Sequence, residues 1–199
     1  MNATPHEHAE RNDEFLERAF RELLIERGIV SQAEVDARVE FIYEREGAAY
    51  GQRVVARAWT DPEFRARLLS DGSSAVRELG IEIGALKLVV VENTPQVHNV
   101  IVCTLCSCYP RMLLGMPPDW YKSIPYRSRA VREPRAVLAE FGLVLDAETT
   151  VRVHDSTADM RYLVLPMRPA GAERLSESEL SALVSRDSMI GVAQVRAAH

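Results

Sequence analysis

Apolar residues recur at helical spacing near the start of the chain. The repeat stops before Gly28 and joins six positions: Phe15, Leu16, Ala19, Phe20, Leu23 and Leu24. It predicts an amphipathic helix from about Asp13 to Arg27. Ser31 and Glu34 have the spacing of a capping box, which predicts a second helix running through Val35, Val39 and Ile42. These two helices would form an arm that packs either around another subunit or on its own domain.

Helix signals and strand signals then follow in turn. Asp61-Pro62 supplies a cap and a first-turn proline for a helix to about Leu69. β-branched and apolar runs predict strands at 86–91 and 97–102, with the turn Asn93-Thr94-Pro95 between them. The remaining predicted elements are helices at 75–79 and 134–141, strands at about 149–153 and 162–165, and a helix opened by Ser176 and Glu179.

This order of elements predicts an α+β fold, with a helical N-terminal arm followed by a layered α-β-β-α domain. We expect residues 1–11 to be a flexible tail, residues 12–50 the arm, and residues 51–199 the main domain. No stretch has the roughly 18 apolar residues of a membrane span. The first residues also lack the apolar run of a signal peptide, so we expect a cytoplasmic protein with no membrane partner.

Charge is unevenly distributed along the chain. The formal net charge of −5 gives no general attraction to nucleic acid. Residues 111–135 nevertheless carry +4, which leaves −9 for the rest of the chain. This positive segment is either solvated charge or a surface that meets an anionic group or an acidic partner.

The cysteines carry the strongest chemical signal. All three lie within six consecutive positions, in Cys103-Thr104-Leu105-Cys106-Ser107-Cys108. An odd, tightly clustered set cannot form a disulfide framework and indicates metal or redox chemistry. Three thiolates and the amides between them could wrap one strongly polarising ion and leave one octahedral position open.

Other cysteine chemistries fit less well. A zinc site would need a fourth ligand, such as His98 or His154, and zinc prefers tetrahedral sites built from separate pairs of ligands. A thioredoxin-like pair at Cys103 and Cys106 would not be followed by a third cysteine. An iron-sulfur cluster usually takes four thiolates. His98 itself is typical of a strand histidine with satisfied hydrogen bonds.

The hexapeptide resembles the metal-binding loop of nitrile hydratase α subunits, which hold non-corrin cobalt(III) or non-haem iron(III). The resemblance extends over nearly the whole chain after the tail. It includes the stretches at 54–64, 91–94, 97–98, 117–122, 126–129, 131–135 and 186–192. Position 104 is threonine, as in the cobalt-type members that the chain resembles, whereas iron types have serine there. The resemblance therefore implies one Co(3+) per subunit as the cofactor, with iron as the alternative.

The resemblance implies a ligand set and an activity, and it makes residues 51–199 the expected metal-binding catalytic domain. The metal would be held by the sulfurs of Cys103, Cys106 and Cys108 and by the amide nitrogens of Ser107 and Cys108. Cys106 would be a sulfinate and Cys108 a sulfenate. A bound nitrile would be attacked by the Cys108 oxygen, or by water, to give the amide, so Cys106 and Cys108 are the predicted catalytic residues.

The implied partners are other proteins and a small-molecule nitrile. In the family a β subunit supplies arginines to the oxidised cysteines, so we expect a β-type subunit, or separate β and γ subunits, and a cobalt-delivery activator protein. A non-catalytic cobalt carrier is the alternative from another functional class. In that case Trp120 and the arginine run would have no catalytic role.

The chain also departs from the family pattern. Ordinary members have Trp-Pro after the residues that match Tyr109-Pro110, whereas this chain has Arg111-Met112. Thiocyanate hydrolase, a related cobalt enzyme, has an arginine there, and toyocamycin nitrile hydratase takes a polar nucleoside nitrile. Arg111 and Trp120 are therefore predicted to line the substrate pocket, with a nucleoside nitrile as the expected substrate and thiocyanate as the alternative.

Overall fold

The structure is a computed structural model of the 199-residue chain, and it describes residues 5–37, 49–105 and 108–196. Side chains are described from residue 15 onward. The chain divides into two compact units, Met1–Glu44 and Arg45–His199. No described helix is both long enough and apolar enough to cross a membrane.

The first unit is helical, as the sequence predicted. Helix α1 spans Pro5–Glu26, so it begins within the residues 1–11 that we expected to be a tail. Proline at the first helical position is compatible with helix initiation, because its missing N–H would be unsatisfied there. The capping box is confirmed, since the Glu34 amide donates to Ser31 Oγ at 3.2 Å and the Ser31 amide donates to Glu34 Oε2 at 2.8 Å. Helix geometry follows at 32–37, whereas Val39 and Ile42 lie outside the described residues.

The second unit contains helices and short strands. Its helices are α3 (Ala49–Thr60), α4 (Pro62–Ser70), α5 (Gly72–Glu78), α6 (Arg111–Leu114), α7 (Asp119–Lys122), α8 (Ile124–Arg132), α9 (Pro134–Glu140), α10 (Glu177–Leu183) and α11 (Arg186–Ile190). Its strands are β1 (Lys87–Glu92), β2 (Val97–Val102), β3 (Thr150–Asp155) and β4 (Met160–Leu165).

Local sequence explains where the helices of this unit begin. Asp61 caps α4 by accepting from the Phe64 amide at 2.9 Å, and Pro62 occupies the first turn. Ser176 and Glu179 form a complete capping box on α10. Helices α3, α8 and α11 were not among the predicted elements. In α3, Gly51 is needed because an added Cβ would lie 2.7 Å from Met189 Sδ and 2.9 Å from the Leu113 carbonyl oxygen.

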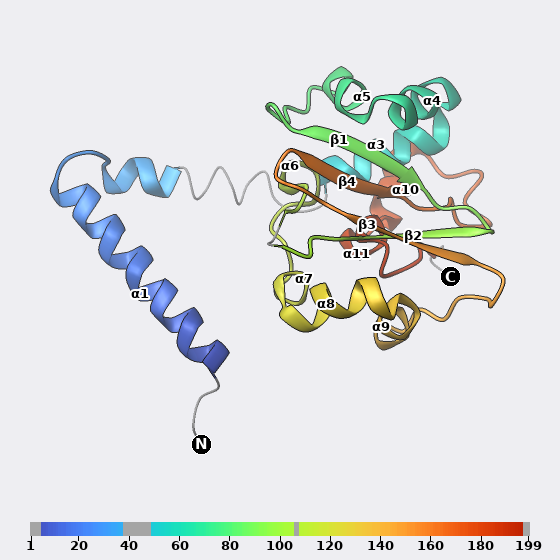
Figure 1. The fold of residues 1–199 in the computed structure, drawn as a ribbon. Coiled ribbons are helices and arrows are strands. Elements are labelled where there is room, and N and C mark those ends of the chain that lie inside the picture. The colour runs from blue at the N-terminus through green and yellow to red at the C-terminus, as the bar shows by residue number, and fades with distance from the viewer. Residues whose placement is uncertain (1–4, 38–48, 106–107, 197–199) are drawn as a thin grey trace. The chain divides into compact units, whose positions relative to one another are not determined.

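Strand pairing joins segments that are far apart in the sequence. Strand β1 pairs in parallel with β4, from Lys87 opposite Met160 to Glu92 opposite Leu165. Strand β2 pairs in parallel with β3, which places Val102 opposite Asp155. Helices α4 and α5 pack on β1 and helix α9 packs on β3, so the strands lie between two groups of helices, as Figure 1 shows. This arrangement confirms the α+β layered fold.

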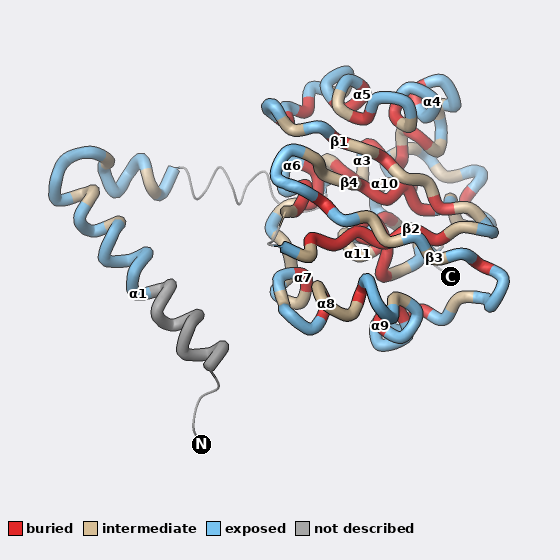
Figure 2. The backbone as a smooth tube through the Cα atoms, viewed as in Figure 1, coloured by how far each residue is buried: buried red, intermediate tan, exposed pale blue. Residues whose placement is uncertain are grey.

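The core of the second unit is formed by its strands and by the inner faces of its helices. Figure 2 shows buried residues along β2 and β4 and exposed residues on the outer turns of α4, α5, α8 and α9. Val100, Ile101 and Val102 in β2 and Leu163 in β4 are almost fully buried. Because β2 is buried along most of its length, it fixes the position of the cysteine loop that follows it.

Candidate metal centre

The cysteine loop begins at the end of the buried strand β2. Cys103 follows Val102 directly and is only 1% exposed. The ladder with β3 continues past the strand end, where the Ser156 amide donates to the Val102 carbonyl at 2.8 Å. The backbone at Cys103 is therefore held by the β2–β3 sheet, and Cys103 is shielded from water.

Asp155, the last residue of β3, holds the next residue of the loop. Its Oδ1 accepts from the Thr104 amide at 2.9 Å, and its Oδ2 accepts from the Thr104 hydroxyl at 2.5 Å. Both Thr104 contacts end on one carboxylate, because the register places Asp155 opposite Val102. A serine hydroxyl could make the same contact, so the contact itself does not distinguish the cobalt-type threonine from serine.

The far end of the loop is held by a tyrosine. Cys108 is partly buried, and its carbonyl oxygen accepts a hydrogen bond from the Tyr121 hydroxyl at 3.0 Å. Cys106 and Ser107, a predicted sulfur ligand and a predicted amide ligand, lie outside the described residues. Within the described part of the chain, no group of three or more His, Cys, Asp or Glu side chains is placed to hold a metal ion. The described loop ends fit a metal-thiolate site in their donor chemistry, because each carries a cysteine whose sulfur can bind a metal as the thiolate.

Trp120 lies in an aromatic cluster next to the loop. Its ring centroid is 4.9 Å from that of Tyr126 and 4.6 Å from that of Phe141, both with edge-to-face geometry. The side chain is half-buried and packs against the main core. Aromatic pairs with this geometry stabilise packing, so the described contacts of this predicted pocket residue are those of a core residue.

Arg111 is exposed at the start of α6. Its Nη2 donates to Met116 Sδ at 3.4 Å, and none of its contacts among the described residues is to a carboxylate. The guanidinium therefore keeps most of its donors available for a ligand or a partner.

A surface cavity of about 340 Å³ opens beside Thr104. It is lined by residues of the loop and of α8: Thr104, Ile124, Arg127, Ser128, Val131 and Arg132. Next to Thr104, Leu105 is 89% exposed, and Ile124 and Val131 are also exposed. The positive segment predicted from the sequence thus contributes two arginines to a partly apolar surface at the loop.

The histidines proposed as zinc ligands have other hydrogen-bond partners. The His98 Nε2–H donates to the Gly191 carbonyl at 2.7 Å, which leaves Nδ1 to accept from Asn93 Nδ2 at 3.3 Å. His154 Nε2 lies 2.8 Å from Asn99 Oδ1. Burial lowers the pKa of both histidines, so each is held neutral near physiological pH. Both ring nitrogens of His98 are occupied, as expected for a satisfied strand histidine.

The whole chain can be compared with known proteins. The family profile described as "Nitrile hydratase, alpha chain" matches residues 11–193. The chain belongs to this family. The cysteine loop described above is therefore the cysteine loop of a nitrile hydratase α chain.

Individual relatives agree with this assignment. The low-molecular weight cobalt-containing nitrile hydratase subunit alpha of Rhodococcus rhodochrous is 51% identical over 177 residues, covering 88% of this chain and 85% of the relative. Thiocyanate hydrolase subunit gamma of Thiobacillus thioparus is 42% identical and covers 90% and 79%. A solved double mutant of the Fe-type nitrile hydratase from Comamonas testosteroni Ni1 is 43% identical, with a TM-score of 0.86 over 98% of this chain and 93% of that one.

Sequence reasoning missed the side chains that hold the loop. Asp155 and Tyr121 contact Thr104 and Cys108 across 51 and 13 residues, respectively. No local pattern links them to the cysteines. The one available signal was the end of the predicted strand at 149–153, because a polar residue just after a strand can face the loop of a neighbouring strand.

Proposed function

We propose that the chain is the metal-binding α subunit of a cobalt nitrile hydratase, which converts a nitrile to the amide together with a β-type subunit. One observation carries the proposal. The cysteine hexapeptide stands at the end of a buried strand in a chain that is 51% identical to a cobalt-containing nitrile hydratase α subunit. A β subunit alone, or separate β and γ subunits, would complete the enzyme.

The proposed ligands are the sulfurs of Cys103, Cys106 and Cys108 and the amide nitrogens of Ser107 and Cys108. One trivalent cobalt ion per subunit, when bound, would supply a Lewis acid that polarises the nitrile. The position of Cys103 directly after the buried strand β2 supports this set, because ligands that meet at one ion must be held in defined positions. A cobalt-delivery protein would load the site.

Cys106 and Cys108 are the proposed catalytic residues. In their oxidised forms, a sulfinate and a sulfenate, they add anionic oxygens at the site. The Cys108 oxygen, or a water molecule held beside it, would attack the nitrile carbon. The Tyr121 hydrogen bond to the Cys108 carbonyl supports this role, since a nucleophile must be held in a fixed direction.

A polar nitrile is the proposed substrate. Arg111 replaces the tryptophan of ordinary members, and its exposed guanidinium could donate to ribose or ring oxygens. A nucleoside nitrile such as toyocamycin has such acceptors. Trp120 is the other proposed pocket residue, and it is only partly buried.

Thiocyanate hydrolysis is the second candidate activity. It is favoured by the 42% identity to a thiocyanate hydrolase gamma subunit and by Arg111, whose charge would suit an anionic substrate. A cobalt carrier without turnover is the third candidate, and it would need neither Arg111 nor a partner subunit.

One experiment separates these candidates. The chain is co-expressed with β-type partners and a cobalt-delivery protein, and the purified complex is given toyocamycin, small nitriles and thiocyanate separately. Amide formation supports the hydratase, with the highest kcat/KM expected for toyocamycin. Carbonyl sulfide from thiocyanate supports the alternative enzyme, and cobalt retention without turnover supports the carrier. The intact mass of the loaded chain is expected to rise by about 48 Da of oxygen, from one sulfinate and one sulfenate.

A further inference from the structure

Tyr121 is a fully buried residue that reaches the cysteine loop from a separate helix. It lies in α7, two residues after the exposed Asp119, and it is 0% exposed. Its hydroxyl donates to the Cys108 carbonyl at 3.0 Å. A buried tyrosine hydroxyl needs a partner of this kind, so the contact contributes to both the fold and the loop.

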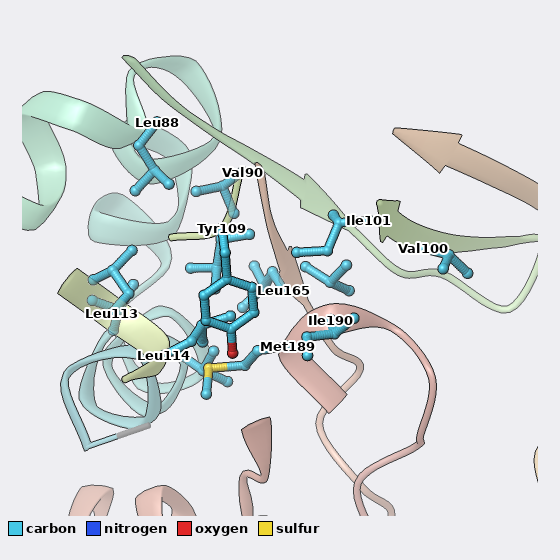
Figure 3. Close-up of a cluster of buried hydrophobic side chains, with 14 of the residues drawn as sticks. Leu88, Val90, Val100, Ile101, Tyr109, Leu113, Leu114, Leu165, Met189 and Ile190 are labelled. Carbon is cyan, nitrogen blue, oxygen red and sulfur yellow. The ribbon is translucent and has the colours of Figure 1, made fainter. Parts of the chain in front are cut away.

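The ring of Tyr121 is held by other aromatic residues. Its centroid lies 4.9 Å from that of Tyr109 at an interplanar angle of 68°, and 5.7 Å from that of Tyr126. Figure 3 shows Tyr109 among buried side chains of β1, α6, β4 and α11, including Val90, Leu114 and Met189. Packing of this density leaves Tyr121 little freedom to move away from Cys108.

The contact constrains the third cysteine in particular. The Cys108 carbonyl carbon, amide nitrogen and Cβ all share one Cα atom, so fixing the carbonyl limits the directions of the other two. Asp155 holds Thr104 at the beginning of the loop, and Tyr121 holds Cys108 at its end. Ligands that must meet at one ion depend on groups around them that set their orientation.

We propose that Tyr121 is a positioning residue for the cobalt centre, and that its hydrogen bond to the Cys108 carbonyl directs the Cys108 sulfur and amide nitrogen toward the metal. This inference rests on the proposed function. The hydroxyl touches neither substrate nor metal in this role, so it acts through the main chain of Cys108.

Tyr126 provides a matched control within the same aromatic cluster. It is 5% exposed, and its hydroxyl donates to a main-chain carbonyl, that of Ile101, at 2.7 Å. Ile101 lies within β2 rather than in the loop. Tyr121→Phe and Tyr126→Phe therefore remove the same kind of hydrogen bond at similar burial, and only the first removes a contact with a ligand residue.

The test uses both variants in the complex with partner subunits. We expect Tyr121→Phe to lose cobalt to a chelator about tenfold faster, to shift the sulfur-to-cobalt absorption band, and to lower kcat roughly tenfold with little change in KM. Tyr126→Phe is expected to keep the band and to stay within about twofold of wild type in kcat, although both variants lose similar stability.

Outcomes that contradict the proposal are distinct from failure of the proposed function. If the two variants are indistinguishable in the absorption band and in kcat, Tyr121 has only a structural role. If the wild-type complex itself takes up no cobalt, the proposed function fails instead. Should Tyr121→Phe not fold, 3-fluorotyrosine at position 121 keeps the ring and strengthens the donor, and the band must then shift at position 121 but not at position 126.

Discussion

Asp155 shows how one side chain can order the start of a loop. Its carboxylate accepts from both the amide and the hydroxyl of Thr104. The two contacts are separable, because replacing the hydroxyl leaves the amide contact intact. Asp155 is exposed, so solvent competes for both bonds and the net contribution of each is modest.

We expect Thr104→Val to destabilise the metal-free chain by about 1 kcal/mol, since it removes one of these hydrogen bonds and keeps the side-chain shape. Asp155→Ala should cost more, because it removes the acceptor of both. Urea unfolding followed by circular dichroism measures the two free energies of unfolding. Thr104→Ser keeps the hydroxyl and is the control, with a smaller loss than valine. Equal losses for Thr104→Val and Asp155→Ala would show that the amide contact contributes nothing.

At the level of elements, α11 is joined to β2 by a close backbone approach. Gly191, at the C-terminal end of α11, has a φ of 93°, and an added Cβ would lie 2.0 Å from the Asn99 carbonyl oxygen. The Gly191 carbonyl also accepts from His98 in the same strand. Helix and strand therefore meet here with no space for a side chain.

Gly191→Ala is expected to destabilise the chain by roughly 3 kcal/mol or more, which combines left-handed strain with the overlap on Asn99. Gly171→Ala is the matched control. Gly171 has a φ of 83°, but an added Cβ there would meet nothing within 4 Å, so only the strain of about 1 kcal/mol applies. Thermal unfolding of the two variants checks the difference. Equal melting temperatures would mean that β2 and α11 separate easily.

The elements also show which parts of the fold the sequence could predict. The run at 97–102 predicted β2 with its observed bounds, because β-branched residues at four of its positions are typical of a buried strand. The partner of that strand, 53 residues further along the chain, could not be predicted, since a hydrophobic run specifies burial and not pairing. Helix α3 was missed because its Gly51 and paired valines are poor helix formers whose positions are decided by tertiary packing.

The candidate site was predictable to a similar extent. Three cysteines in six positions indicated metal or redox chemistry from the sequence alone. Tyr121 and Asp155 reach the loop only through the arrangement of α7 and β3, so nothing in the hexapeptide indicates them. The positions of Cys106 and Ser107 lie outside the described residues, and their roles as ligands remain predictions.

At the scale of the whole molecule, the first unit carries several exposed apolar side chains on its described helix. Phe15 and Leu16 are each 68% exposed, Phe20 is 62% exposed and Leu23 is 44% exposed. Aromatic and aliphatic side chains gathered on one helix face are typical of protein interaction surfaces. The second unit has its own large core, so its stability does not depend on these side chains.

Deletion of residues 1–44 is therefore expected to leave the melting temperature of the remaining chain within about 3 °C of the full chain, by the usual scaling of stability with size. Copurification with a β-type partner should fall strongly, because the apolar face of α1 is lost. Scanning calorimetry and affinity capture measure the two effects. Full-length chain with Phe20→Ser tests the same face without deletion. Unfolding of the truncated chain would show that the second unit is not self-sufficient.

The parallel register of β2 and β3 limits how the length of this chain can vary. Side chains alternate along a strand, so one residue inserted between 150 and 154 would bring His154 to the place of Asp155 and turn the carboxylate to the opposite side of the sheet. An insertion in the segment from 142 to 149, before the strand begins, leaves that pairing unchanged. Anyone recombining segments of related chains must therefore transfer Thr150 through Asp155 as an uninterrupted block together with the cysteine hexapeptide, whereas a change of length ahead of Thr150 does not shift this register.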